Sequence, residues 1–114
     1  MTDEKIVKAF EELDYSLFKD GADPDEVNGI YKYCVYYEGS LKKGDQKIFY
    51  QVIEFVFINE KEDFDEEKLI SKIETTGLSF DGGDYGNLKK VNGGDIVKSL
   101  TLRFLRPKKR KCIY

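Results

Sequence analysis

The strongest constraint on the fold is the run KIFYQVIEFVFIN at residues 47–59. Its β-branched and aromatic residues favour a strand. In a strand, one face carries Phe49, Ile53, Phe55 and Phe57, and the other carries Ile48, Tyr50, Val52, Val56 and Ile58. A strand that is apolar on both faces must be covered on both. We expect the chain's own helices to supply one cover, and a neighbouring subunit is a candidate for the other.

Two segments have the periodicity of amphipathic helices. In residues 2–18 the apolar side chains fall on one stripe, formed by Ile6, Phe10, Leu13 and Leu17. The second helix is expected to begin after Asp65, which has the side chain of an N-cap, and to end at Gly77. Phe64, just before the cap, is expected to pack against Leu69 as a hydrophobic staple.

Three further segments favour strands. Residues 30–38, IYKYCVYYE, are rich in aromatic and β-branched residues. Residues 78–80 predict a short strand. Residues 95–106 predict an alternating strand that ends where Pro107 removes a backbone donor, and its core-facing side chains are expected to be Ile96, Leu100, Leu102 and Phe104. Loops are predicted for the polar and glycine-rich segments at 19–29, 39–46 and 81–94.

These elements predict a single α+β domain at residues 1–106, followed by a basic, flexible C-terminal tail at residues 107–114. The order is helix, strand, strand, helix, strand, strand. It favours a mainly antiparallel four-stranded sheet with two helices packed on one face. A chain of 114 residues buries about two-thirds of its surface on folding, which is enough for one core.

The net charge of −3 conceals a separation of charge along the chain. Residues 1–30 hold nine acidic residues and three lysines, and residues 59–68 hold six acidic residues and two lysines. Residues 106–112 hold five basic residues and no acid. One interpretation is a solvated surface with a frayed basic tail. The other is electrostatic complementarity with a partner or between copies, and opposite charges at opposite ends suit a head-to-tail ring.

No residue pattern predicts catalysis, a cofactor or a metal. The chain has no histidine, which removes the commonest general base and the usual metal ligand. The segment DGGDYGNLKK lacks the spacing of a phosphate-binding loop, and the acids at 60–67 lack that of an EF-hand. Cys34 and Cys112 have no zinc or CxxC spacing and are expected to be free thiols. We therefore expect no enzyme, no secretion signal and no membrane-spanning segment.

Binding through surfaces is the expected activity. Tyrosines, which are favoured at interfaces, and charged loop residues are the candidates for an interface with another subunit or with a different protein: Tyr31, Tyr36, Tyr37, Lys42, Lys43, Glu60, Glu62, Asp63, Lys89 and Lys90. A candidate basic docking arm is formed by Arg106, Lys108, Lys109, Arg110 and Lys111. The same five charges would also give salt-sensitive, non-specific contacts with nucleic-acid phosphates.

One order of features runs through most of the chain. It begins with the helix from Ile6 to Leu17, the strand YCVYYE at residues 33–38 and a polar loop. The long aromatic strand then runs into NEKEDFDEEKL at residues 59–69, and the second helix ends in GLSF at residues 77–80 before the final strand. In this order the chain resembles the small tail-terminator or tail-completion proteins of long-tailed bacteriophages and of prophages in Gram-positive bacteria.

The resemblance implies a structural role in a virion that is assembled in the cytoplasm of the bacterial host. Such proteins form a ring, commonly a hexamer, at the head-proximal end of the tail tube, where they stop tube growth and support head–tail joining. The implied partners are further copies of the chain, the tail-tube protein and the head-completion protein. The basic C-terminal tail departs from the family pattern. The alternative is a small nucleic-acid-associated regulator or inhibitor of a mobile element that uses this tail.

Overall fold

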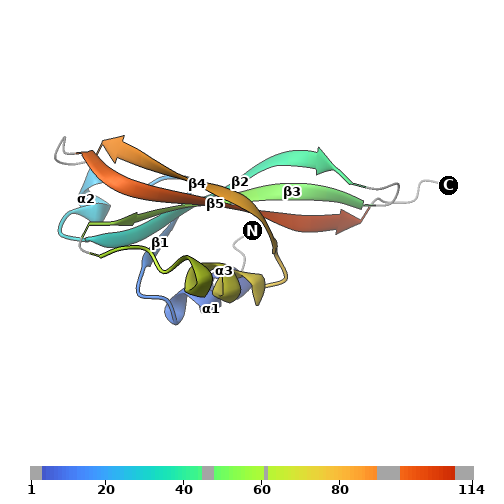
Figure 1. Ribbon diagram of the computed structural model, residues 1–114, viewed down its shortest axis with the longest axis horizontal. Coiled ribbons are helices and arrows are strands. Elements are labelled where there is room, and N and C mark those ends of the chain that lie inside the picture. The colour runs from blue at the N-terminus through green and yellow to red at the C-terminus, as the bar shows by residue number, and fades with distance from the viewer. Residues whose placement is uncertain (1–3, 45–47, 61, 90–95, 110–114) are drawn as a thin grey trace.

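The aromatic run is the central strand of a five-stranded sheet (Figure 1). The computed structural model describes residues 4–44, 48–60, 62–89 and 96–109. In chain order its elements are α1 (Glu4–Glu11), β1 (Ser16–Lys19), α2 (Pro24–Val27), β2 (Lys32–Lys43), β3 (Ile48–Asn59), α3 (Glu66–Glu74), β4 (Ser79–Lys89) and β5 (Ile96–Lys109). The α+β class is as predicted. The predicted four strands and their order are wrong, because the sequence pattern predicts neither β1 nor α2.

The strand order in the sheet is β1-β2-β3-β5-β4. All neighbouring pairs are antiparallel except β1 and β2, which are parallel. β3 therefore lies between β2 and β5, where other elements can cover both of its faces. This is the position that its two-sided apolar pattern requires.

The helices α1 and α3 cover one face of the sheet (Figure 1). Phe55 of β3 is fully buried beneath them, and its ring centroid lies 5.8 Å from that of Phe10 in α1. Within the sheet, the Phe55 ring lies 5.7 Å from the Tyr36 ring and 5.5 Å from the Phe104 ring. The main core is thus an aromatic layer between the sheet and two helices.

The opposite face of the sheet is covered at one end by α2 and the segment joining β1 to β2. Val27 of α2 is fully buried there and clusters with Tyr33, Val35 and Ile58. The chain itself therefore supplies part of the second cover of β3. Val56, further along this face, is only half-buried.

The first helix is shorter than the predicted 2–18. α1 ends at Glu11, and residues 16–19 form β1, which pairs in parallel with Tyr33–Tyr36 of β2. Leu17 packs against the main core from this strand, so tertiary contacts outweigh the weak local preference for helix. The first three residues of the predicted stripe are buried as expected: Ile6, Phe10 and Leu13.

The second helix begins where predicted and ends slightly before the predicted Gly77, since α3 ends at Glu74 and its C-cap is Thr75. The Asp65 carboxylate accepts a hydrogen bond from the Lys68 amide at 3.3 Å, which makes Asp65 the N-cap of α3. Phe64 and Leu69 pack in the same core cluster. Gly77 follows the helix with a φ of 96°, a conformation that glycine adopts without a steric cost.

The glycine-rich segment is largely a strand rather than the predicted loop. β4 extends from Ser79 to Lys89 and pairs with β5 along its length. The register shifts between Phe80 and Gly82, where Gly82 has a φ of 140°. This bulge lets β4 continue past the point where the sequence predicts its end.

The last strand also continues past its predicted end. β5 runs to Lys109, so Pro107 lies within the strand and does not stop it. β4 pairs with β5 only as far as Leu105, which leaves Pro107 on a strand edge, where a missing N–H is tolerated. At the other end of β5, Ile96 is 74% exposed, and the prediction that it faces the core is wrong.

Three strands extend past the helices as an arm (Figure 1). The arm comprises residues 39–43 of β2, 48–51 of β3 and 105–109 of β5, so part of the predicted loop at 39–46 and of the predicted tail is sheet. The molecule measures 54 × 25 × 24 Å. Its radius of gyration, 15.3 Å, exceeds the roughly 13 Å of a compact chain of this length because of this extension.

Candidate functional site: the arm and the acidic end

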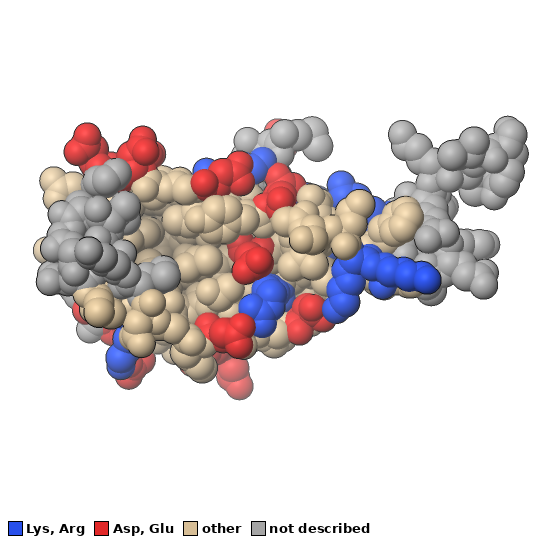
Figure 2. Space-filling model, turned by 90° about the horizontal axis from the view of Figure 1, so that it is seen from above, with Lys and Arg blue, Asp and Glu red and all other residues tan. Residues whose placement is uncertain are grey.

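The arm is basic. Its three segments contain no acidic residue and five basic ones, Lys42, Lys43, Arg106, Lys108 and Lys109. Figure 2 shows Lys and Arg side chains grouped along the arm, with others scattered over the body of the molecule. The structure thus brings the two candidate interface lysines of β2 into the same arm as the docking-arm residues of β5, with β3 between them, although they lie more than sixty residues apart in the sequence.

The register places one lysine on each side of an aromatic residue at the tip of the arm. Phe49 of β3 is directly opposite Lys43 of β2 and Lys108 of β5. Side chains of directly opposed residues project from the same face of a sheet, so these three form one row, which we call the tip row. Leu41, two residues from Lys43, projects from the same face and is 66% exposed.

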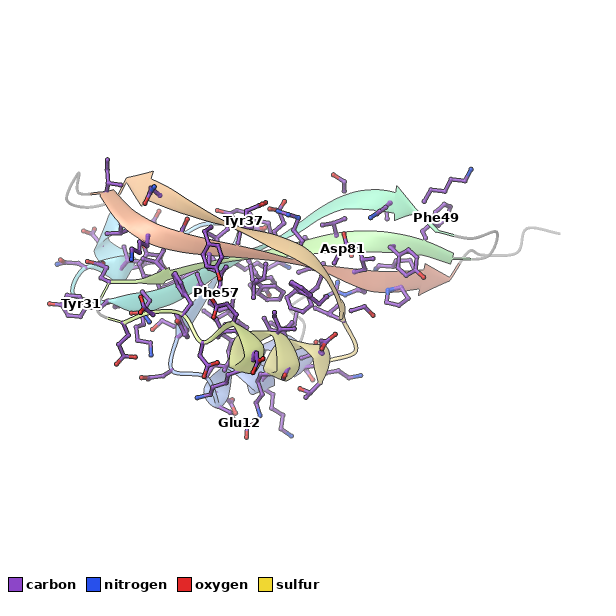
Figure 3. All side chains as sticks on the ribbon, viewed as in Figure 1. Glu12, Tyr31, Tyr37, Phe49, Phe57 and Asp81 are labelled. Atoms are coloured by element: carbon purple, nitrogen blue, oxygen red, sulfur yellow. The ribbon has the colours of Figure 1, made fainter. Side chains whose placement is uncertain are left out.

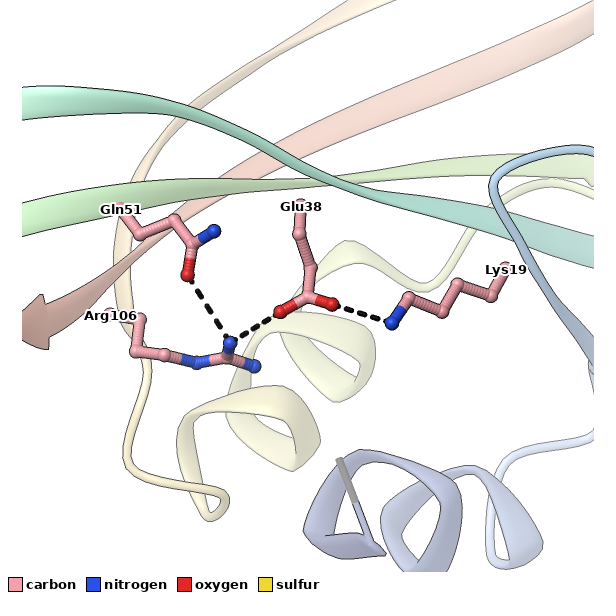
Figure 4. A network of polar contacts seen from close by, with 4 residues as sticks. All are labelled: Lys19, Glu38, Gln51 and Arg106. Carbon is pink, nitrogen blue, oxygen red and sulfur yellow. Dashed lines mark hydrogen bonds and ion pairs between the residues drawn. The ribbon is translucent and has the colours of Figure 1, made fainter. Parts of the chain in front are cut away.

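A polar network lies where the arm leaves the body (Figure 4). The Arg106 guanidinium donates to the Glu38 carboxylate at 2.6 Å and to the Gln51 side-chain oxygen at 3.3 Å. Lys19 forms an ion pair with Glu38, also at 2.6 Å. Hydrogen bonds from Lys19 and Arg106 lower the pKa of Glu38 to about 2. Arg106 therefore ties β5 to β2 and is a structural residue rather than part of a free docking surface.

A further ion pair joins β2 to β4 across the face of the sheet opposite α1 and α3. The Lys42 ammonium lies 3.4 Å from the Asp81 carboxylate of β4. In the strand order, β2 and β4 are separated by β3 and β5. The contact requires the sheet to coil strongly, and it partly neutralises the charge of Lys42.

Three adjoining hollows of about 500, 540 and 600 Å³ surround the segment that joins β3 to α3. The first two share Glu62 and the last two share Asp63. Two lysines, Lys32 and Lys98, also line them. The carboxylates that line them define the acidic end: Asp14, Glu60, Glu62, Asp63 and Glu66.

The acidic end and the tip row lie at opposite ends of the molecule. Figure 3 shows Tyr31, which lines the first hollow, at one end and Phe49 at the other. The twelve residues of β3 connect the two ends and span roughly 37 Å. Opposite charges are therefore separated along the long axis.

Asn59 holds the acidic segment in place. Its side chain is buried, donates to the Tyr15 hydroxyl at 3.2 Å and accepts from the Glu62 amide at 2.9 Å. Lys32 lies 4.9 Å from the centre of the Tyr15 ring and 3.7 Å from the Glu62 carboxylate. Burial raises the pKa of Tyr15. These contacts give Glu62 a fixed backbone while its side chain stays 69% exposed.

The candidate tyrosines separate into different environments. Tyr31 is 45% exposed beside the first hollow, and Tyr37 is 40% exposed on the face of the sheet opposite α1 and α3. Tyr36 is 2% exposed in the main core, so its assignment to an interface is wrong. It projects toward α1 and α3, because alternate residues of β2 point to opposite faces.

The structure does not describe the side chains of five candidate lysines and arginines. Lys89 ends β4 and Lys109 ends β5, but their side chains are not among those described. Lys90, Arg110 and Lys111 lie outside the described residues. The arm's described charges are thus those of Lys42, Lys43, Arg106 and Lys108.

Sequence reasoning missed two carboxylates of the acidic end. Asp14 falls inside the predicted first helix, and only the early end of α1 places it beside Glu62. Glu66 reads as a first-turn helix acid, yet it lines the third hollow and accepts a hydrogen bond from the Tyr85 hydroxyl. Contacts between residues so far apart in the sequence leave no pattern in the local sequence that would predict them.

The described part of the chain contains no group of side chains arranged to hold a metal ion. Cys34 is a buried free thiol, as predicted, and burial raises its pKa well above the ordinary value. Cys112 lies outside the described residues. None of the described helices is long and apolar enough to cross a membrane. No protein-family model matches this chain, and no curated protein matches it either.

Proposed function

We propose that this chain is a structural subunit that assembles head to tail into a ring, in the manner of the tail-terminator and tail-completion proteins of long-tailed phages. The observation that carries the proposal is the separation of charge between the basic arm and the acidic end. In this role the ring, expected to be a hexamer, caps the head-proximal end of a tail tube and supports head–tail joining in the bacterial cytoplasm.

The charge separation favours one class of interface. Contacts between two arms or between two acidic ends place like charges together and are disfavoured, whereas the arm of one copy is attracted to the acidic end of another. A head-to-tail contact places the basic arm of one copy against the acidic end of the next. Such contacts form a closed ring when the rotation between copies closes.

The test uses the purified chain with isolated tail tubes that lack their terminal ring. We expect electron microscopy to show a ring on one end of each tube, and added tube protein to extend only the other end. Light scattering at high concentration gives a second measurement, with oligomers expected. A chain that stays monomeric at high concentration and also fails to bind tubes contradicts the proposal.

A second candidate function is binding to nucleic acid through the arm. The observation in its favour is the arm's five basic residues without any acid. Binding of this kind weakens steeply with salt, with a slope set by the number of phosphates contacted. Deleting residues 110–114 leaves β5 intact, so a truncated chain tests the last basic residues without disturbing the sheet. Tight low-salt binding to duplex DNA that this deletion abolishes would favour the second candidate.

A further inference from the structure

We infer that the tip row of one copy docks on the acidic end of a second copy, with Lys43 and Lys108 paired to Glu62 and Asp63. This inference rests on the proposed head-to-tail assembly and names the two surfaces that meet. It assigns the contact to strands of the arm rather than to a frayed C-terminal tail.

The contacts within the arm select which of its charges are available. Arg106 is bound to Glu38 and Gln51, and Lys42 is paired with Asp81. Lys43 and Lys108 are exposed and form no ion pair with any of the described residues. They lie on the strands flanking β3, so their Cα atoms are roughly 10 Å apart across the arm.

The acidic end offers a prepared surface. Glu62 and Asp63 are both exposed, and they occupy the two boundaries between the three hollows, with Glu62 3.7 Å from the Lys32 ammonium. The Asn59 hydrogen bond fixes the Glu62 backbone before any partner arrives. A surface that is already ordered loses less conformational entropy on binding, which strengthens association.

The apolar parts of the two surfaces also match. Hollows of about 500 to 600 Å³ accommodate side chains rather than a whole strand. The tip row supplies Phe49 between its lysines, with exposed Leu41 on the same face. Tyr31, 45% exposed at the first hollow, offers an aromatic surface for these groups, and tyrosine is favoured at protein interfaces.

A second copy fits the arm better than a nucleic acid does. Among the described residues, five carboxylates and two lysines line the hollows, so each copy carries a surface complementary in charge to its own arm. The whole chain has a net charge of −3, which opposes approach to a polyanion.

The test exchanges the charges of the two surfaces. The arm-reversed variant carries Lys43→Glu and Lys108→Glu, and the end-reversed variant carries Glu62→Lys and Asp63→Lys. Matched controls change the same number of charges on α1 and α3: Lys8→Glu with Lys68→Glu, and Glu11→Lys with Glu67→Lys. Circular dichroism and thermal unfolding verify that each variant folds. If the end-reversed variant fails to fold, Glu62→Gln with Asp63→Asn replaces it as a loss-of-charge variant.

Sedimentation velocity at roughly millimolar protein is expected to show oligomers of the wild type and of both controls. Each reversed variant alone should associate at least about tenfold more weakly, because like charges then meet at the contact. Mixing the two reversed variants should restore oligomers, since each arm then faces an end of opposite charge. Combining all four substitutions in one chain should restore them as well, which separates a head-to-tail contact from an arm-to-arm contact.

Three outcomes overturn the inference. Wild-type oligomers that both reversed variants retain would refute these surfaces while leaving head-to-tail assembly and tube binding intact. Loss of duplex DNA binding in the arm-reversed variant, with self-association unchanged, would make the arm a nucleic-acid element. A wild type that stays monomeric at millimolar concentration and on tail tubes would refute the proposed function together with the inference.

Discussion

At the scale of single residues, Glu38 couples the body of the protein to the arm. Its carboxylate joins Lys19 of β1 to Arg106 of β5, and its side chain is only 23% exposed. Because its pKa falls from 4.5 to about 2 in the folded chain, the ionised form is favoured by folding. The contribution of ionised Glu38 to the free energy of unfolding is therefore present above pH 4.5 and is lost as the pH falls toward 2.

The substitution Glu38→Gln is therefore expected to lower the free energy of unfolding at neutral pH by about 1–3 kcal/mol. Urea unfolding at a series of pH values measures this difference, which should shrink between pH 4.5 and 2 as wild-type Glu38 becomes protonated. Glu12→Gln is the control, because the Glu12–Lys72 pair is exposed and screened by water, and its loss should be much smaller. A difference for Glu38→Gln that does not change with pH would contradict this account.

The environment of single side chains was only partly predictable from sequence. Alternation assigns Tyr36 and Glu38 to one face of β2, and the structure agrees. It does not show that Tyr36 lies under the helices while Glu38 lies just beyond them. That difference depends on where α1 and α3 end over the sheet, which is a tertiary property.

At the scale of elements, β4 depends on glycines that admit close backbone contact. A Cβ atom added to Gly83 would lie 2.6 Å from the Thr101 carbonyl oxygen and 2.9 Å from a Leu102 methyl group. Real Cβ atoms are essentially never that close to such atoms, and the carbonyl belongs to a paired strand that cannot rotate away. The glycine content that indicates a loop in the sequence is thus a requirement of strand pairing here.

We expect Gly83→Ala to lower the free energy of unfolding by about 1–3 kcal/mol, the usual cost of overpacking. Gly86→Ala is the matched control in the same strand, since its Cβ would meet only the Ser99 hydroxyl oxygen at 3.2 Å, and a side chain can adjust. Chemical unfolding of both variants measures the difference. Equal stability of the two variants would show that the β4–β5 register differs from the one described.

The elements that the sequence predicts well are those with strong local signals. β3 is apolar on both faces, and α3 has its own cap and staple, so both were predicted with nearly the right boundaries. β1 has only four residues and forms because β2 offers a free edge. No local pattern distinguishes such a strand from the end of an amphipathic helix, which explains the error in the first helix.

At the scale of the whole molecule, the sequence predicts the sign of the charged regions but not their geometry. The arm combines basic residues from β2 and β5, which only the register of the sheet brings together. The acidic end likewise combines Asp14 with the segment after β3. The chain can therefore be described by its net charge of −3 or by its two ends of opposite charge. These two descriptions predict different effects of salt on association.

If net charge dominated, copies of this chain would repel each other, and added salt would screen the repulsion and strengthen association. If the ends pair, salt should weaken association instead, because raising the ionic strength from about 0.01 to 1 M shortens the Debye length from about 30 to 3 Å. We expect sedimentation velocity to show that association of the wild type weakens as salt is added across this range. The variant with Lys43→Glu and Lys108→Glu should instead associate more strongly as salt is added, since it keeps the acidic end and loses the complementary charge of the arm. A wild type whose association grows with salt would mean that its oligomers form through apolar contacts rather than through opposite ends.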